Sequence, residues 1–309
     1  MKLAFIFPGQ GSQSVGMLSD LADKFSIVNE IFAQAKDTLG YDLWHLIQTG
    51  PAQKLAQTEI TQAAMLTSGF ATYQVCQKEL NIAPSVMAGH SLGEYTALVA
   101  AEALTFNDAL NLVATRGRLM QQAVEIGAGA MAAILGLADE VVQEVCATTD
   151  GVVEAVNFNS PGQIVIAGEK QAVENACKLA KEKGAKRALV LPVSVPSHSS
   201  LMKPAADKFS QYLNDVVINP PHIPVINNVD AKAEIEPDMI RSALIRQLYN
   251  PVLWVDIINN MASQNIDTII ESGPGKVLFG LNRRINKNIA NYTVFDSASL
   301  ESLQNSLKG

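Results

Sequence analysis

Residues 84–94 read PSVMAGHSLGE, an apolar run that leads through a Gly-x-Ser-x-Gly turn into an apolar helical pattern. The run at 84–90 predicts a buried strand because it is short and mostly apolar, and helical patterns follow at 92–102 and 107–125. A strand, a sharp turn at Gly89, Ser91 and Gly93, and a helix form the context in which a serine can act as a nucleophile. The glycines allow strand and helix to approach closely while the Ser91 hydroxyl stays exposed. The simpler alternative is an ordinary turn with an N-capping serine.

Strands and helices alternate on both sides of this turn. A strand is expected at 3–7, and the large-domain pattern resumes at about residue 195 with strands at 223–229 and 266–271 and helices at 237–249 and 251–264. Such alternation predicts a parallel sheet covered by helices, the α/β class, with an α/β-hydrolase-like arrangement. The last dozen residues are polar and are expected to be frayed.

The pattern becomes shorter between Gly127 and residue 194. Its order is β-α-β-β-α-β, with strands expected at 130–137, 152–158, 163–167 and 186–193 and helices at 139–148 and 169–183. This order is the signature of a ferredoxin-like module. We therefore expect a large α/β catalytic domain made of 1–126 plus 195–309, and a small ferredoxin-like domain inserted at 127–194.

Composition excludes several classes of protein. The 309 residues carry 23 Lys+Arg and 30 Asp+Glu, a net charge of −7, which gives no global field for a nucleic acid. No apolar run approaches the length of a membrane span. The three cysteines have no CxxC spacing, which disfavours a disulfide framework and a zinc site and fits a reducing cytoplasm. The Gly-rich loops at 9–11 and 273–276 match neither nucleotide-binding fingerprint.

A serine nucleophile needs a base, and four histidines are available. His45 lies in a helical apolar context, and His222 in a Pro-rich connection. His90 precedes Ser91 directly, so the two side chains are expected on opposite faces of the chain. His198, just beyond a strand end and C-terminal to the serine, is left as the candidate base, in the order that α/β-hydrolase-like enzymes use.

The helix expected at 107–125 carries Arg116 in the middle of its apolar face, whereas Arg118 has polar neighbours. A buried guanidinium needs an internal carboxylate or an anion of the ligand. Its planar fork suits a carboxylate on an acyl group. The backbone N–H groups of Leu92, at the helix start, and of Gln10, in the loop after the first strand, are candidate oxyanion donors.

Six segments together resemble the malonyl-CoA:acyl carrier protein transacylase family of bacteria: FPGQGSQ at 7–13, GHSLGEY at 89–95, RG at 116–117, NFNSPGQ at 157–163, VPSH at 195–198 and QLYNPV at 247–252. The resemblance spans essentially the whole chain. It implies a ping-pong transfer through a malonyl ester on Ser91, with His198 as the base and Arg116 holding the malonyl carboxylate.

The resemblance also implies roles for further residues. The Gln10 and Leu92 N–H groups would form the oxyanion hole, and a backbone carbonyl at or near Gln247 would orient His198. Gln62 matches a position that lines the pocket, and the small Ser197 suits an unbranched malonyl group. No metal or other cofactor is implied, since CoA and phosphopantetheine enter as carriers of substrate and acceptor.

The partners implied are malonyl-CoA and acyl carrier protein. Carrier proteins of this system are acidic, so a protein of charge −7 needs a local basic patch, and the candidates are Arg283, Arg284 and Lys287, or Lys181, Lys183, Lys186 and Arg187. A monomer in the cytoplasm is expected. Two other interpretations stay open: a serine hydrolase or thioesterase using Ser91 and His198, and a carrier-protein-binding subunit without activity.

Overall fold

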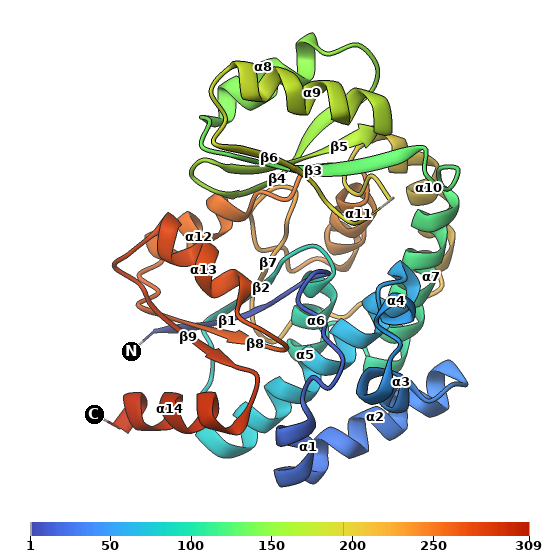
Figure 1. Ribbon diagram of the computed structural model, residues 1–309. Coiled ribbons are helices and arrows are strands. Elements are labelled where there is room, and N and C mark those ends of the chain that lie inside the picture. Colours follow the sequence, from blue (N-terminus) through green and yellow to red (C-terminus); the bar gives the residue numbers. More distant parts are fainter. Residues whose placement is uncertain (1, 194, 309) are drawn as a thin grey trace.

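The computed structural model describes residues 2–193 and 195–308 and contains two separate sheets (Figure 1). The larger sheet is wholly parallel, with strand order β7-β2-β1-β8-β9. Its strands are β1 (Leu3–Phe7), β2 (Val86–Gly89), β7 (Val225–Ile226), β8 (Thr268–Ser272) and β9 (Ala290–Val294). The expected α/β fold with a parallel sheet is confirmed.

Helices cover both faces of the parallel sheet. Side chains alternate between the two faces along each strand, so one strand contributes to two core clusters. Phe5 and Phe7 of β1 belong to one core cluster, and Ala4 and Ile6 to another. The second cluster is covered by α12 (Trp254–Ser263) and α13 (Val277–Ile285). The first includes side chains of α1 (Ser19–Lys24), α2 (Ser26–Leu39), α3 (Leu43–Thr49), α4 (Ala52–Leu55), α5 (Thr58–Leu80), α6 (Gly93–Ala100), α7 (Phe106–Gln122), the 3-10 turn η1 (Ser200–Met202), α10 (Lys203–Asn214), α11 (Pro237–Gln247) and α14 (Ser297–Lys308).

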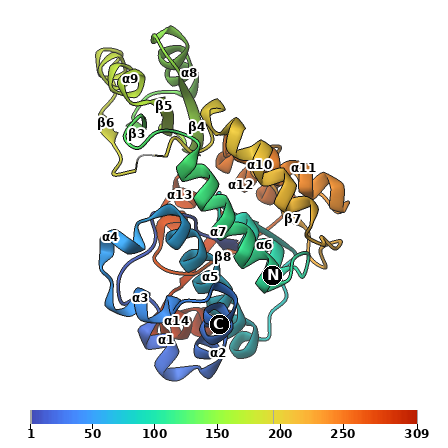
Figure 2. The same cartoon turned by 90° about the vertical axis from the view of Figure 1, so that its right-hand side faces the viewer.

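The smaller sheet is antiparallel and lies beyond the carboxyl ends of the parallel strands (Figures 1 and 2). It follows the chain order β3 (Gly129–Leu135), α8 (Asp139–Thr148), β4 (Val153–Ser160), β5 (Gln163–Glu169), α9 (Lys170–Glu182) and β6 (Arg187–Val190). The spatial order β4-β5-β3-β6 is the arrangement of a ferredoxin-like β-α-β-β-α-β unit. Ser194, the last residue of the expected insertion, lies outside the described residues, as do Met1 and Gly309.

Only one face of the smaller sheet is covered by its own helices. Ala130, Ala132 and Ile134 of β3 pack with α8 and α9, whereas the intervening Met131 belongs to a separate small cluster on the opposite face. Strand β4 also joins the two parts of the chain through a parallel bridge between Asn157 and Val252. The face without helices is therefore turned toward the parallel sheet.

The structure corrects two expectations about element ends. The C-terminal residues are not frayed, because Leu300 and Leu303 of α14 are buried against the core. The strand expected at 223–229 is limited to Val225 and Ile226, because Asn227 and Asn228 turn out of the sheet and use their side chains in hydrogen bonds. Across the described residues, we find no helix with the length and apolar character needed to cross a membrane.

Candidate active site

Ser91 occupies a sharp turn between β2 and α6. Its φ of 51° lies in the left-handed region, which a non-glycine residue enters at a cost in free energy. A Cβ on Gly89 would lie 1.8 Å from the backbone carbon of Gly93, and one on Gly93 would lie 2.1 Å from the Phe7 carbonyl oxygen. Because only glycine fits at both positions, the chain forms the tight turn that the sequence predicts and presents the Ser91 hydroxyl at the carboxyl edge of the sheet.

His198 contacts the serine directly. The Ser91 Oγ lies 2.8 Å from His198 Nε2, and His198 Nδ1 lies 2.7 Å from the Gln247 carbonyl oxygen. A carbonyl can only accept, so Nδ1 carries the proton and Nε2 accepts from the serine hydroxyl. Burial, reinforced by the positive charge of Arg116, lowers the pKa of His198 to about 3. The imidazole is therefore neutral at physiological pH and free to accept a proton.

The other histidines have different environments. His90 Nε2 lies 2.8 Å from the Asn159 Oδ1 of strand β4, and although His90 also lines the cavity, its hydrogen bond is to that asparagine and not to the serine hydroxyl. His45 is exposed, and His222 is exposed beside Glu102 at 3.0 Å. The geometry thus pairs Ser91 with the histidine that elimination on the sequence selects.

Arg116 of α7 is 1% exposed, whereas Arg118 is exposed, as the helical pattern predicts. Its Nη2 donates to the Gln247 Oε1 at 2.9 Å and to the Ser91 Oγ at 3.3 Å. Among the described residues its guanidinium forms no ion pair, and its buried Nε has no hydrogen-bond partner. A buried cation without a carboxylate partner, beside a nucleophile, is suited to binding an anionic group of a ligand.

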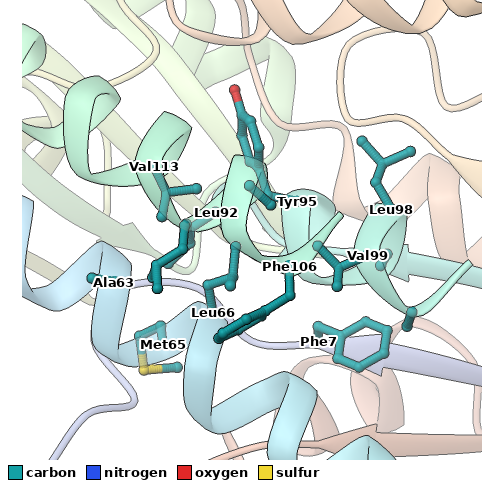
Figure 3. Close-up of a cluster of buried hydrophobic side chains, with 14 of the residues drawn as sticks. Phe7, Ala63, Met65, Leu66, Leu92, Tyr95, Leu98, Val99, Phe106 and Val113 are labelled. Carbon is teal, nitrogen blue, oxygen red and sulfur yellow. The ribbon is translucent and has the colours of Figure 1, made fainter. Parts of the chain in front are cut away.

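Two backbone N–H groups are candidate donors for an oxyanion site. No hydrogen bond between described residues uses the N–H of Gln10 or of Leu92. Leu92 precedes the first residue of α6, where the helix dipole favours negative charge. Its side chain is buried in the cluster that also holds Leu66 of α5 and Val113 of α7, which fixes the backbone at this point (Figure 3).

A cavity of about 130 Å³ opens at these residues, between the parallel sheet and the helix-free face of the smaller sheet. Seven of the eight residues selected from the sequence line it: Gln10, Gln62, Ser91, Leu92, Arg116, Ser197 and His198. The eighth, Gln247, is fully buried behind the wall and contacts three of them. The lining also includes four apolar side chains of the smaller unit: Met131, Val165, Leu191 and Val193.

Two buried polar residues with contacts at the turn were not selected from the sequence. Asn228 Oδ1 accepts from the Ser91 N–H at 2.6 Å, and its Nδ2 donates to the Gly89 carbonyl at 2.7 Å. Glu94 accepts from the Asn228 N–H at 2.9 Å. A pair of asparagines directly after a strand, at the edge where α/β sheets form their sites, is the signal that could have identified Asn228.

The described residues hold no group of three or more His, Cys, Asp or Glu side chains arranged to bind a metal ion. The three cysteines are unpaired and buried.

Comparison with known proteins gives consistent results over nearly the whole chain. The acyl transferase domain model matches residues 4–298. The malonyl CoA-acyl carrier protein transacylase of Escherichia coli K12 is 56% identical over 286 residues, 92% of this chain and 93% of that protein. The protein of the same name from Haemophilus influenzae is 55% identical over 306 residues, 98% of each chain.

Solved structures agree in fold as well as in sequence. The acyl carrier protein S-malonyltransferase of Vibrio cholerae superposes with a TM-score of 0.95 at 54% identity, covering 98% of this chain and 100% of that one. A malonyl-transacylase solved in complex with its type II PKS acyl-carrier protein gives a TM-score of 0.97 at 50% identity, covering 99% and 100%. Because the acyl transferase model and relatives at 55–56% identity both span nearly the whole chain, this chain belongs to the acyl transferase family, and within it to the malonyl-CoA–acyl carrier protein transacylases.

Proposed function

We propose that this chain transfers the malonyl group of malonyl-CoA to the phosphopantetheine thiol of acyl carrier protein through an ester on Ser91. The product, malonyl-acyl carrier protein, would serve fatty acid elongation. The observation that carries the proposal is the contact of Ser91 Oγ with both His198 Nε2, at 2.8 Å, and Arg116 Nη2, at 3.3 Å. One group activates the hydroxyl, and the other is a cation in the place where a short acyl chain would end.

In the first half of the reaction, His198 Nε2 takes the hydroxyl proton as the Ser91 Oγ attacks the thioester carbonyl. The negative charge that develops on the carbonyl oxygen is stabilised by the Gln10 and Leu92 N–H groups. The carbon–sulfur bond then breaks, and the CoA thiolate takes the proton from His198. The malonyl group is left as an ester on Ser91.

The second half reverses these steps with a different thiol. His198 takes the proton of the phosphopantetheine thiol, and the sulfur attacks the ester carbonyl. The ester bond to the Ser91 Oγ breaks, and His198 returns the proton to that oxygen. The Gln247 carbonyl, by accepting from His198 Nδ1 at 2.7 Å, keeps the imidazole in the tautomer that both halves require.

Substrate selection is assigned to Arg116, which would bind the free malonyl carboxylate. Gln62 is assigned to the same pocket because it lines the cavity and its Nε2, which has only the weakly accepting Met120 Sδ at 3.6 Å as a partner, can donate to an oxygen of the acyl group. Ser197 has a small side chain at the pocket wall, which suits an unbranched malonyl group. Thioester exchange by this route needs only a nucleophile, a base and oxyanion donors, so we propose that the enzyme uses no metal or other cofactor.

Several broader features belong to the same proposal. Residues 1–126 plus 195–309 would form the catalytic domain and residues 127–194 an inserted domain, with the site between them. The carrier protein would dock on Arg283, Arg284 and Lys287, which are exposed on and after α13. The protein would act as a monomer in the cytoplasm, where buried unpaired thiols such as Cys76 persist.

The experiment is a two-substrate kinetic measurement with malonyl-CoA and holo acyl carrier protein. Parallel double-reciprocal lines are expected, because CoA leaves before the carrier protein reacts, and Ser91→Ala should abolish transfer. Release of free malonate at the rate of malonyl-CoA consumption, with no malonyl carrier protein formed, would instead identify a hydrolase. Carrier-protein binding without turnover would identify a docking subunit.

A further inference from the structure

Glu94 is a buried carboxylate next to the active site for which the mechanism above has no use. It lies in the first turn of α6 and is 2% exposed. Within the described chain it forms no ion pair, and its hydrogen-bond donors are the Asn228 N–H at 2.9 Å and the Gln247 Nε2 at 2.8 Å, both on Oε2. Burial raises the pKa of Glu94 to about 7. A buried acid without a cationic partner lowers the stability of the folded protein at neutral pH. We therefore expect Glu94 to serve the function of the site.

The contacts of Gln247 indicate that role. Its Nε2 donates to the Glu94 Oε2 and, at 3.0 Å, to the Ser91 carbonyl, while its Oε1 accepts from the Arg116 Nη2 at 2.9 Å. A carboxamide turned by 180° would face these acceptors with its oxygen and a guanidinium with its NH₂ group. All of these hydrogen bonds would be lost. The Asn228 Oδ1 is a third, more distant acceptor at 3.5 Å, so Glu94 supplies the shortest of the contacts that fix which end of Gln247 faces Arg116.

The orientation of Gln247 matters for the acyl group. An arginine side chain has many rotamers, and the Gln247 Oε1 holds this one with its Nη2 at 3.3 Å from the Ser91 Oγ. A carboxylated acyl group on Ser91 needs the guanidinium in that place, whereas an acetyl group has no carboxylate for it to bind. Misplacing the arginine therefore costs more for malonyl than for acetyl.

We propose that Glu94 is a positioning residue for acyl-group selection: by fixing the Gln247 carboxamide it holds Arg116 in place for the carboxylate of the acyl group. The inference rests on the proposed malonyl transfer. Glu94 acts through Gln247 and Arg116 and touches no reacting atom.

The test compares rates of Ser91 acylation by malonyl-CoA and by acetyl-CoA, measured by intact mass under single-turnover conditions. In Glu94→Ala the malonyl-to-acetyl ratio should fall at least about tenfold, the loss expected for one misplaced hydrogen bond to a charged group. Glu94→Gln should keep the ratio within about threefold of the wild type, because the Asn228 N–H can only donate and so holds the oxygen of the substituted carboxamide in the same place. Glu94→Asp, with its acceptor withdrawn, should give an intermediate ratio.

Glu271→Ala is the matched control. Glu271 of β8 is 1% exposed and accepts from two N–H groups, those of Leu278 at 3.0 Å and Phe279 at 2.7 Å, but it has no link to Arg116. This variant should lose stability as Glu94→Ala does and keep the malonyl-to-acetyl ratio.

An unchanged ratio in the folded Glu94→Ala or Glu94→Asp protein would overturn the inference, as would a ratio in Glu94→Gln as low as in Glu94→Ala. These outcomes differ from a failure of the proposed function itself, in which the wild-type protein would form no malonyl adduct at Ser91.

Discussion

Ser91 and His198 both have positive φ angles, 51° and 68°, which are unusual for residues with a side chain. Each is held there by neighbours: the Ser91 N–H donates to the Asn228 Oδ1, and the His198 N–H to the Leu248 carbonyl at 3.0 Å. Such strain concentrates at functional sites, where surrounding contacts can maintain it. The sequence predicted both residues through motif and elimination. It did not predict Asn228, because a hydrogen bond to the backbone of a residue 137 positions away belongs to no motif; only the pair of asparagines after a strand could have indicated it.

Replacing Arg116 tests the selection of the acyl group. In Arg116→Ala the rate of Ser91 acylation by malonyl-CoA should fall at least about tenfold more than the rate with acetyl-CoA, because only malonyl loses a charged hydrogen bond. Arg118→Ala, an exposed change on the same helix, is the control and should alter neither rate. An equal loss with both acyl donors would contradict the role of Arg116.

The pH dependence of acylation tests the state of His198. The base acts when neutral, and burial with the Arg116 charge lowers its pKa to about 3. As pH falls, kcat/KM for malonyl-CoA should therefore show no decline centred on 6.5, the ordinary histidine value, and His198 should limit the rate only as pH approaches 3. Arg116→Ala removes a positive charge, which raises the pKa of His198, so the decline in kcat/KM should move to higher pH. A wild-type decline centred near the ordinary histidine value that Arg116→Ala leaves in place would contradict the assignment.

The elements that position the site were predictable wherever one pattern dominates. Strand β1, with five buried residues, and the β2–turn–α6 unit, with glycines that tolerate no Cβ, are specified locally. The ferredoxin-like order was also predictable, since its short elements alternate regularly. The end of the chain was not predictable: α14 has two buried residues among polar ones, and β9 is mostly half-buried. Whether these segments are ordered therefore depends on tertiary packing, which periodicity does not show.

Helix α14 offers a direct test of that correction. Leu303 is fully buried in the main core cluster, so Leu303→Ala should lower the free energy of unfolding by about 2–5 kcal/mol. Asn305→Ala, on the exposed side of the same helix, should change it by less than about 0.5 kcal/mol. Urea unfolding monitored by circular dichroism gives both values. Similar small changes in the two variants would mean that the C-terminal residues are frayed after all.

The charge of the molecule bears on both partners, since malonyl-CoA and an acidic carrier protein are anionic while the chain carries −7. In the proposed reaction, local cations overcome the net field: Arg116 inside the cavity, and a surface patch outside it. Of the two candidate patches, the one at Lys181–Arg187 is partly neutralised, because Lys183 pairs with Glu144 at 2.8 Å. Among the described residues Arg283, Arg284 and Lys287 form no ion pair, which favours their patch.

Charge reversal distinguishes the two patches. Arg283→Glu with Arg284→Glu should raise KM for the carrier protein about three- to tenfold and reduce its dependence on salt, while acylation by malonyl-CoA keeps its rate. Lys181→Glu with Lys183→Glu is the matched double reversal and should leave KM near the wild-type value. A raised KM in the Lys181→Glu, Lys183→Glu protein, with an unchanged KM in the arginine variant, would place docking at the end of helix α9.

The covalent step is tested most directly by the mass of the intact protein after incubation with malonyl-CoA in the absence of carrier protein. We predict one malonyl adduct per chain, carried by the peptide that contains Ser91, absent from Ser91→Ala and lost when holo acyl carrier protein is added. A wild-type protein that shows no adduct, or an adduct that persists in Ser91→Ala, would contradict transfer through Ser91.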